Sequence, residues 1–573
     1  MSLSALLQYA VFLLTVTLLV KPVGRYLAHV FSGERTFLDP LLCPLERLLY
    51  RWTGVNAKAE MRWQEYAQAF VIFGMVGTLL LYSILRLQQF LPWFFAASMT
   101  TPMTPDLAMN TAVSFSTTTT WQAYAGETTL SYFSQIVGLT VQNFLAGAAG
   151  LAVGVAFVRG LARDRVETIG NFWVDLVRSI LWVLLPLSLT CALVLVWQGV
   201  PMNFHPYTQA KGLEGVGQTI AQGPVAALES IKNLGTNGGG FFNANGAHPY
   251  ENPTPLANFI EMLAIAVLPA AFTHTFGLMV GRPRHGWALY RVMVLLFIAG
   301  LLACGWSEQR GNPLLPHALN IRATASQAGG NMEGKEVRFG ITSSVLTAVT
   351  TSNGATGSYN SMHDSYTPIG GMVPLVNMLL GEIIFGGLGT GIYSIIVIAL
   401  VALFLAGLMV GRTPAYLGKK IRAPESKMIM LYILASPIAV LLCAALAVMT
   451  RGGLAGLVTN TGTHGFTEIL FAFASANANN GQNFAGLNGN TAFYNLTTAI
   501  TMMMGRFGLA IPALALAGLF AAQQPAPESA GTLPTTSTSF TVLLTATILI
   551  VSALSYFPAL ALGPLLEHLT MHR

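Results

Sequence analysis

The chain has 573 residues, of which 53% are hydrophobic and only 9% are charged. Soluble domains carry about 25% charged residues, so a water-soluble protein of this length is excluded. The net charge of +6 does not indicate nucleic-acid binding, because Lys and Arg lie between the apolar runs, where membrane proteins carry them. Since a span needs about 20 apolar residues and many segments qualify, we expect an all-α polytopic membrane protein.

Ten apolar segments are long enough to cross a bilayer, and the charges beside them indicate an orientation. The first segment, Ser2–Val20, is followed by Lys21 and Arg25 rather than preceded by positive charge, which predicts a retained span with an external N-terminus. The other Lys and Arg residues favour the same topology, with an external C-terminus. The predicted spans are residues 2–20, 66–85, 128–157, 172–198, 256–280, 287–304, 371–410, 428–449, 491–521 and 539–565.

Four of the external connections share an unusual composition. They are rich in Gly, Thr, Ser and Asn, and their windows contain no Asp, Glu, Lys or Arg. Their markers, Thr118, Gly238, Gly354 and Gly481, recur at nearly even intervals, each between two long apolar spans. This pattern predicts four repeats of span, re-entrant loop and span. The windows are residues 109–126, 233–250, 347–363 and 473–490.

A short stretch with helix-start signals opens each loop. Thr104 is a predicted cap before Pro105, and Gly223 with Pro224 begins the second stretch in the same way. Each stretch is too short to cross the bilayer, so the chain must enter and return on one side. The predicted organisation is a first span with a cytoplasmic loop (1–64), four repeats (65–158, 172–280, 286–410 and 427–521) with pore loops at 106–126, 223–250, 342–362 and 466–489, and a last span (538–573).

The loop composition predicts a site for a monovalent cation. Irregular backbone is tolerated at membrane depth only where protein or a wet cavity surrounds it, so four loops can shield each other around one axis. The preceding helices would then point their partly negative C-terminal ends toward that axis. Neutral oxygens can replace the hydration shell of a large monovalent ion, whereas calcium or magnesium would require carboxylates. Any single loop of this composition is more often an ordinary turn, but four matching copies favour an ion filter.

Two charged residues lie inside apolar segments. Glu382 belongs to an apolar stretch of about 40 residues, twice the length that a span needs, and the glycines around it predict a broken helix. Arg506 lies in the fourth repeat. Because intramembrane charges usually face a cavity or a partner, we expect both residues to line a path beneath the filter. A buried structural pair, or an Arg that reaches the interface, is the alternative.

No catalytic site is predicted in this chain. Residues Gly329–Glu336 nearly match a phosphate-binding loop, but Glu336 replaces the required Ser or Thr. The sequence also has no aspartyl-phosphate motif and no clustered acid, base or metal set. We therefore expect no nucleotide or organic cofactor.

Four motifs together resemble one known family. NLGTNGGGFFNANGAHPYENPTPLANF, NSMHDSYTPIGG, LGEIIFGGLGTGIY and NNGQNFAGL are similar to segments of the potassium-translocating A subunit of Kdp-type ATPases, in the superfamily of Trk- and Ktr-like transporters. The resemblance covers essentially the whole chain. It implies a bacterial inner-membrane location, potassium as the transported substrate, and two kinds of partner: a P-type ATPase catalytic subunit that hydrolyses ATP, and small single-span accessory subunits.

The resemblance also implies which residues bind the ion. Gln122 matches a position tied to ion affinity, and Glu382 and Arg506 match charged positions below the filter. The resemblance thus implies that Gln122, Glu382 and Arg506 form a gate or a path below the filter. The sequence departs from the usual family pattern at Thr118, where Asn is common, and at Asn353, where Cys is common. The implied filter consists of Thr118, Thr119, Thr236, Asn237, Gly238, Ser352, Asn353, Gly354, Asn479, Asn480 and Gly481.

The sequence thus predicts the ion-selecting subunit of an ATP-driven potassium importer. The first alternative is a self-sufficient Trk- or Ktr-like channel or transporter driven by the membrane potential. The second alternative, a polytopic membrane enzyme, lacks the clustered catalytic groups that it would need.

Overall fold

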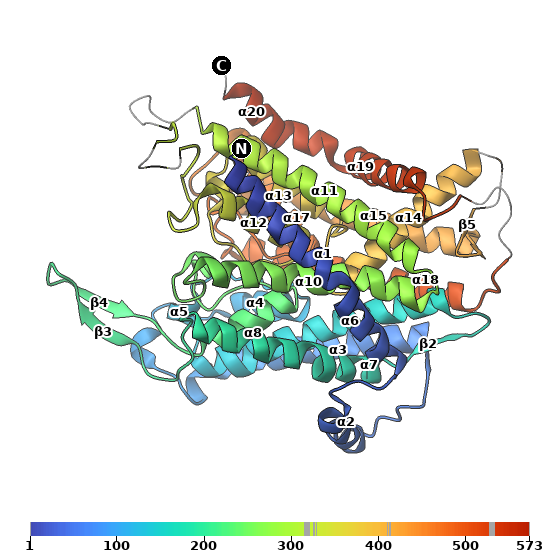
Figure 1. The fold of residues 1–573 in the computed structure, drawn as a ribbon. Helices are drawn as coiled ribbons and strands as arrows, with labels where there is room; N and C mark the ends of the chain where they lie inside the picture. Colours follow the sequence, from blue (N-terminus) through green and yellow to red (C-terminus); the bar gives the residue numbers. More distant parts are fainter. Residues whose placement is uncertain are drawn as a thin grey trace.

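The structure is a computed structural model that describes residues 2–313, 321–324, 327, 329–409, 411, 414–526 and 533–571. Residues 1, 410 and 573 limit the predicted segments 1–64, 371–410, 286–410 and 538–573, and they lie outside the described residues. Figure 1 shows the described chain as stacked layers of helices that run between two opposite faces of the molecule. Both ends of the chain lie on the face at the left of this view.

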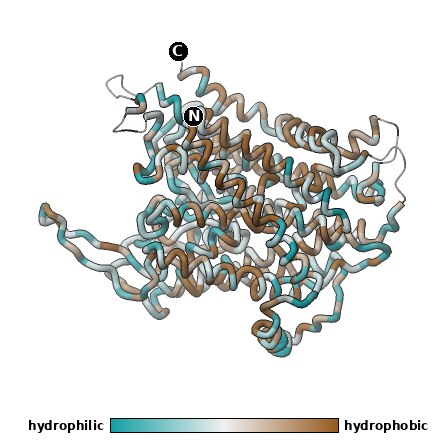
Figure 2. The backbone as a smooth tube through the Cα atoms, in the orientation of Figure 1, coloured by the Kyte–Doolittle hydropathy of each residue, from teal (hydrophilic) through white to brown (hydrophobic). Residues whose placement is uncertain are grey.

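Ten helices are long and apolar enough to span a membrane in the described parts of the chain, as the sequence predicts. Figure 2 shows their middle sections mostly brown and their ends richer in teal. Helices suit this environment because each one satisfies its own backbone hydrogen bonds. They are α1 (Leu3–Ser32), α3 (Trp63–Leu87) with η1 (Gln88–Phe90), η3 (Ser134–Thr140) with α6 (Val141–Ala162), α7 (Phe172–Arg178) with η4 (Ser179–Leu184) and α8 (Leu185–Trp197), α10 (Pro255–Met279), α11 (Pro283–Arg310), α14 (Thr390–Met409), α15 (Ala423–Met449), α18 (Ala492–Ala521), and α19 (Thr538–Leu560) with η7 (Ala561–Leu565) and α20 (Leu566–Thr570).

Four shorter helices, which we call the re-entrant helices, lie between these spans. The first begins at Pro105 after Thr104, as predicted, and the second begins directly after Pro224. All four are largely buried, so their polar residues face protein rather than lipid. They are α4 (Pro105–Ser116), α9 (Val225–Leu234), α12 (Gly340–Asn353) and α17 (Gly462–Asn477).

The span of the third repeat is broken, as its glycines predict. Its first part is α13 (Pro368–Leu379) and its second part is α14, and residues 380–389 between them are not helical. Glu382 and Phe385 in this interval have φ of 58° and 47°, values that a helix does not contain. We call residues 380–389 the break segment.

The remaining elements are short and lie around the bundle. Helix α2 (Asp39–Thr53) lies at the edge, held by an ion pair of 3.2 Å between Glu46 and Arg178. Three two-stranded antiparallel sheets join β1 (Met61–Arg62) to β2 (Thr168–Gly170), β3 (Thr208–Lys211) to β4 (Gly217–Ile220), and β5 (Ala415–Tyr416) to β6 (Lys419–Lys420). The other short helices are η2 (Ala96–Ser98), α5 (Gly126–Thr129), η5 (Asn245–Ala247), η6 (His363–Ser365) and α16 (Arg451–Leu454).

Helix α6 forms the centre of the bundle, because small residues let other backbones approach it closely. A Cβ atom at Gly154 would lie 2.6 Å from Gly389 Cα in the break segment. A Cβ atom at Gly160 would lie 2.5 Å from the carbonyl oxygen of Ala517 on α18. Helix α6 thereby holds both the broken span and α18 against the centre of the molecule.

Candidate functional site: a ring of four re-entrant loops

Each re-entrant helix is followed by the same backbone turn. Thr118, Thr236, Ala355 and Asn479 each stand two residues after the last residue of their helix, and their φ angles are 66°, 49°, 48° and 47°. This left-handed conformation costs a residue with a Cβ atom about 1–2 kcal/mol. Its recurrence at four matching positions indicates that the four loops share one geometry.

This register places the third loop differently from the sequence-based assignment. Ser352 and Asn353 belong to the last turn of α12, where their side chains donate hydrogen bonds back to Ala348 O (2.6 Å) and Val349 O (2.8 Å). Gly354 is the cap of this helix. Counted from the end of each helix, residues 355–357 of the third loop correspond to the predicted residues of the other three loops, whereas the predicted residues 352–354 end and cap α12.

Direct hydrogen bonds join the first loop to its two neighbours. Thr120 donates its hydroxyl to the carbonyl oxygen of Asn237 in the second loop, at 2.6 Å. On the other side, Asn479 of the fourth loop donates its amide to Thr119 Oγ1 at 2.9 Å. The partners in each of the two contacts are more than 100 residues apart in the sequence, so the contacts fix the relative position of three repeats.

The third loop closes the ring. The backbone N–H of Gly357 donates to the carbonyl oxygen of Asn237, at 3.3 Å. Asn480 of the fourth loop donates its side-chain amide to Thr351 O at the end of α12, at 2.9 Å. The four loops therefore surround one axis and shield each other's irregular backbone.

Two glycines permit this close approach. Gly238 has φ of 96°, and a Cβ atom there would lie 2.1 Å from the backbone nitrogen of Gly357. Gly481 has φ of 90°, and its Cβ atom would lie 2.1 Å from the carbonyl oxygen of Thr119. Only glycine satisfies both the backbone angle and the available space at these positions.

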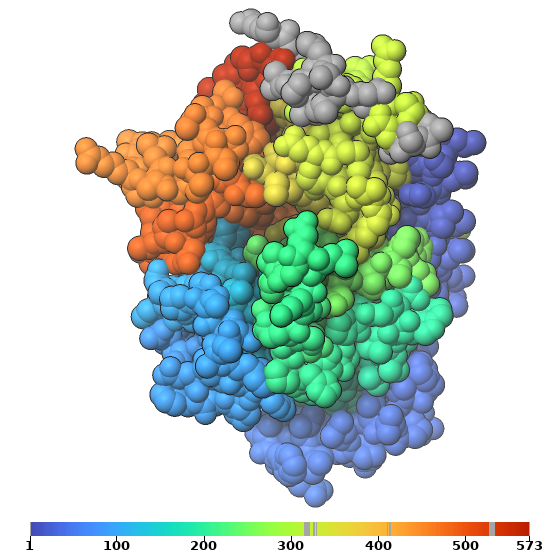
Figure 3. Space-filling view, turned by 90° about the vertical axis from the view of Figure 1, so that its left-hand side faces the viewer, coloured from blue at the N-terminus to red at the C-terminus, as the bar shows by residue number. Residues whose placement is uncertain are grey.

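A vestibule of about 740 Å³ opens beside the ring, on the face of the molecule that the space-filling view draws (Figure 3). Thr120, Gly239, Gly357 and Gly481 line it, one from each loop. Figure 3 shows this face, where light-blue, green, yellow and orange segments meet around a central hollow. The hollow is thus bounded by all four repeats.

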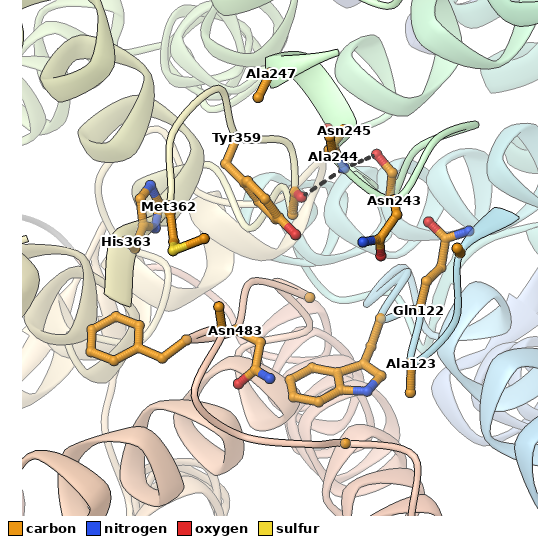
Figure 4. Close-up of a pocket in the computed structure, with 18 of the residues that line it drawn as sticks. Gln122, Ala123, Asn243, Ala244, Asn245, Ala247, Tyr359, Met362, His363 and Asn483 are labelled. Atoms are coloured by element: carbon orange, nitrogen blue, oxygen red, sulfur yellow. Dashed lines mark hydrogen bonds between the residues drawn. The ribbon is translucent and has the colours of Figure 1, made fainter. Parts of the chain in front are cut away.

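Gln122 and His363 face this vestibule from opposite sides (Figure 4), so Gln122 does not lie on the far side of the ring with Glu382 and Arg506, where it was expected. Gln122 accepts a hydrogen bond from the backbone N–H of Gly240 at 2.7 Å and donates one to the hydroxyl of Tyr124 at 3.1 Å, which fixes its amide. Burial, and the nearby charge of Lys335, lower the pKa of His363 to about 3, so its ring is neutral. The histidine therefore adds no positive charge that would repel a cation.

The ring offers oxygens rather than charges. The C-terminal ends of the four re-entrant helices lead into the loops, which places their partly negative poles toward the axis. The residues that follow supply backbone carbonyls and the hydroxyls or amides of Thr and Asn. Such a site can replace the water of a weakly hydrated cation.

A buried charge cluster, which the sequence-based expectations do not include, lies behind the second loop. The ammonium group of Lys232 is 2.7 Å from Glu229 and 2.6 Å from Glu251, and all three side chains are fully buried. The backbone carbonyl of Lys232 accepts hydrogen bonds from Asn237 N (2.8 Å) and Gly238 N (3.0 Å). The spacing of Glu229 and Lys232, three residues apart on a helix, was the available signal.

Arg506 and Glu382 both lie on the opposite side of the ring from the vestibule. Arg506 donates from Nη2 to Ala146 O at 2.7 Å and from Nη1 to Thr118 Oγ1 at 3.3 Å. Glu382 is buried in the break segment and borders a cavity of about 20 Å³ with Asn477. These two described side chains are both buried and form no direct salt bridge with each other.

The comparisons with known proteins agree with this architecture. The model of the family described as potassium-transporting ATPase A subunit matches residues 10–569. A potassium-transporting ATPase potassium-binding subunit from Acidobacterium capsulatum is 51% identical, over 100% of this chain and 99% of the relative. One of the same name from Methylorubrum populi is 55% identical, over 99% of this chain and 98% of the relative.

A solved structure has a similar fold. The potassium transporter TrkH from Vibrio parahaemolyticus superposes with a TM-score of 0.51, covering 86% of this chain and 96% of that one, at 14% identity. At this identity the similarity concerns the fold alone. The family match and the close relatives show that the chain belongs to the potassium-transporting ATPase A subunit family.

Proposed function

We propose that this chain, as a member of the potassium-transporting ATPase A subunit family, binds potassium in the ring of loops and passes it into the membrane. Relatives more than 50% identical over nearly their whole length carry the name potassium-binding subunit. The closed ring of four uncharged loops is the observation that carries the proposal, because it offers the neutral oxygens that a dehydrated potassium ion requires.

The proposed binding residues come from all four loops. The first, second and fourth loops contribute the residues expected from the sequence, and Gln122 holds the vestibule end of the second loop. In the third loop the shared register favours Ala355, Thr356 and Gly357, and we retain Ser352–Gly354 as support for that turn. The residues proposed from the other loops are Thr118, Thr119, Thr236, Asn237, Gly238, Asn479, Asn480 and Gly481.

The path beyond the ring is proposed to pass the break segment. Glu382 borders the cavity there, and its carboxylate suits a cation that leaves the ring. Arg506 lies beneath the first loop, where a fixed positive charge raises the energy of any cation that passes. Together these residues would regulate movement beneath the ring rather than selection within it.

The energy for uptake is proposed to come from partner subunits. The word subunit in the relatives' names supports a multi-subunit ATPase. In this proposal a P-type catalytic subunit hydrolyses ATP and small single-span subunits complete the complex. The chain would span the bacterial inner membrane with both termini and the vestibule outside.

Transport by reconstituted protein tests this proposal. The complete complex in liposomes should accumulate potassium only with ATP, and the isolated chain should give no rapid flux. Rapid ATP-free flux through the isolated chain would instead support the channel alternative. Complete absence of potassium binding by both preparations would contradict the proposed function.

A carboxylate in the ring tests the filter itself. Replacing Gly238 with Asp introduces a charge and a side chain where a Cβ atom already meets Gly357. We expect at least a tenfold loss of potassium affinity and weaker discrimination against sodium, measured by isothermal titration. Gly217→Asp, on an exposed hairpin with no atom within 4 Å of its Cβ position, is the matched control. Equal affinities in the two variants would remove Gly238 from the filter.

A further inference from the structure

Three metal-ligating side chains meet beside the vestibule, outside the ring of loops. Asp364 lies in η6 of the third repeat, and His464 and Glu468 lie four residues apart on α17, hence on one face of that helix. One donor atom from each lies within 4.8 Å of the other two. They form the one such group of three in the described parts of the chain.

His464 has a carboxylate at each of its two ring nitrogens. Its Nδ1 atom is 2.8 Å from a carboxylate oxygen of Glu567 on α20. Its Nε2 atom is 3.0 Å from Asp364 Oδ1 and 3.8 Å from Glu468 Oε1. A carboxylate on one ring nitrogen fixes the tautomer and directs the other nitrogen toward a metal ion.

The second, independent observation is an unsatisfied carboxylate oxygen. The side chain of Glu468 is fully buried, and its Oε1 accepts a hydrogen bond from Asn460 at 2.7 Å. Its Oε2 has no hydrogen-bond partner. A buried acceptor without a partner costs about 1–3 kcal/mol, and more when charged. Protonation of His464 alone does not supply that partner. Oε1 is the oxygen that faces His464, so a cation supplies the partner of Oε2 when both carboxylate oxygens bind it.

The distances and accessibility suit a small divalent ion. Ligand atoms lie about 2.0–2.2 Å from Zn²⁺, so two of them are at most about 4.4 Å apart. The separations of 3.0 Å and 3.8 Å from His464 fall within that limit. The side chains of His464 and Asp364 are 20% and 12% exposed, which leaves an entry path above the buried Glu468.

We infer that Asp364, His464 and Glu468 form a binding site for a divalent transition-metal ion such as Zn²⁺, with Glu567 orienting the histidine. One imidazole and two carboxylates match the ligand preference of Zn²⁺ and similar ions rather than that of potassium. Asp364 also accepts a hydrogen bond from the backbone N–H of Gly486, in the fourth repeat, at 3.1 Å. The bound ion therefore ties the vestibule ends of the third and fourth repeats together.

Cobalt binding tests the inference without measuring transport. Tag-free, chelator-treated complex is titrated with Co²⁺, and the visible absorption of the bound ion is recorded. We expect one saturable site per chain, from which Zn²⁺ displaces Co²⁺, and a higher unfolding temperature with Zn²⁺. Asp364→Asn and Glu468→Gln should each weaken Co²⁺ binding at least tenfold.

A matched control uses a carboxylate away from the cluster. Glu333→Gln removes an exposed carboxylate in the third repeat and should leave Co²⁺ affinity unchanged. The wild-type titration remains decisive even if a variant fails to fold. Absence of saturable binding at millimolar Co²⁺, or equal affinities in Asp364→Asn, Glu468→Gln and Glu333→Gln, would overturn the inference.

Discussion

Replacing Lys232 with Met removes the only cation that contacts two fully buried carboxylates within the described structure. The ammonium group lies 2.7 Å from Glu229 and 2.6 Å from Glu251. Removing one partner of a buried ion pair costs about 3–5 kcal/mol, because the other partner is left uncompensated. Since two carboxylates lose their partner together and repel each other, we expect a loss at the upper end, about 5 kcal/mol in the free energy of unfolding.

The same substitution should weaken potassium binding. The carbonyl of Lys232 holds the backbone N–H groups of Asn237 and Gly238, so a displaced helix end moves the second loop. We expect about a tenfold loss of affinity, equal to about 1.4 kcal/mol. Unfolding in mixed micelles with increasing denaturing detergent measures the stability, and isothermal titration measures the affinity.

Two further variants isolate the cause. Arg62→Met breaks an exposed ion pair of 3.0 Å with Glu167 and should cost less than about 1 kcal/mol. Combining Lys232→Met with Glu229→Gln and Glu251→Gln removes the uncompensated charges and should restore at least half of the lost stability. The reasoning is refuted if Lys232→Met costs no more than Arg62→Met, or if the combined variant recovers nothing.

Gly481→Ala should lower potassium affinity at least tenfold, because its Cβ atom would lie 2.1 Å from the carbonyl oxygen of Thr119. Gly215→Ala also carries a positive φ, 78°, but meets no atom within 4 Å, so it should leave affinity unchanged in the same titration. Arg506→Gln should raise the ATP-free potassium leak of reconstituted complex several-fold, because it removes the positive charge beneath Thr118. Arg506→Lys should keep the leak low, and equal leaks in both variants would contradict a role for the charge.

Local signals made much of the fold predictable. Pro105 after Thr104 favours a helix start through local backbone preferences alone, and α4 begins there. The break in the third repeat follows from the glycines and the excess length of its apolar stretch. Hydropathy predicts the ten spans because each apolar segment must be long enough to cross the bilayer.

The third loop shows where composition is insufficient. Gly354 resembles the glycines of the other loops, yet it caps α12, which continues through Ser352 and Asn353. The left-handed residue of this loop is Ala355, a residue type with no preference for that conformation. Its backbone is imposed by neighbouring loops, and that tertiary constraint is absent from the local sequence.

The charge clusters depend on tertiary structure to an even greater degree. Asp364 and Glu567 are each about 100 positions away from His464, and they meet only because η6, α17 and α20 pack together. Lys232 stands one residue before an uncharged window, so the composition of that window gives no sign of the cluster. In both clusters, individual charges are visible in the sequence, but their pairing is not.

The contact between the second loop and the break segment links two events that would otherwise be separate. The backbone N–H of Leu388 donates to Thr236 Oγ1 at 2.7 Å, and both groups are buried. If the break segment moved away, the buried N–H of Leu388 would lose its acceptor, which costs about 1–3 kcal/mol of free energy. An ion that draws the Thr236 hydroxyl toward itself would weaken the same hydrogen bond to Leu388. Ion binding in the ring and movement of the break segment are therefore coupled through the hydroxyl group of Thr236.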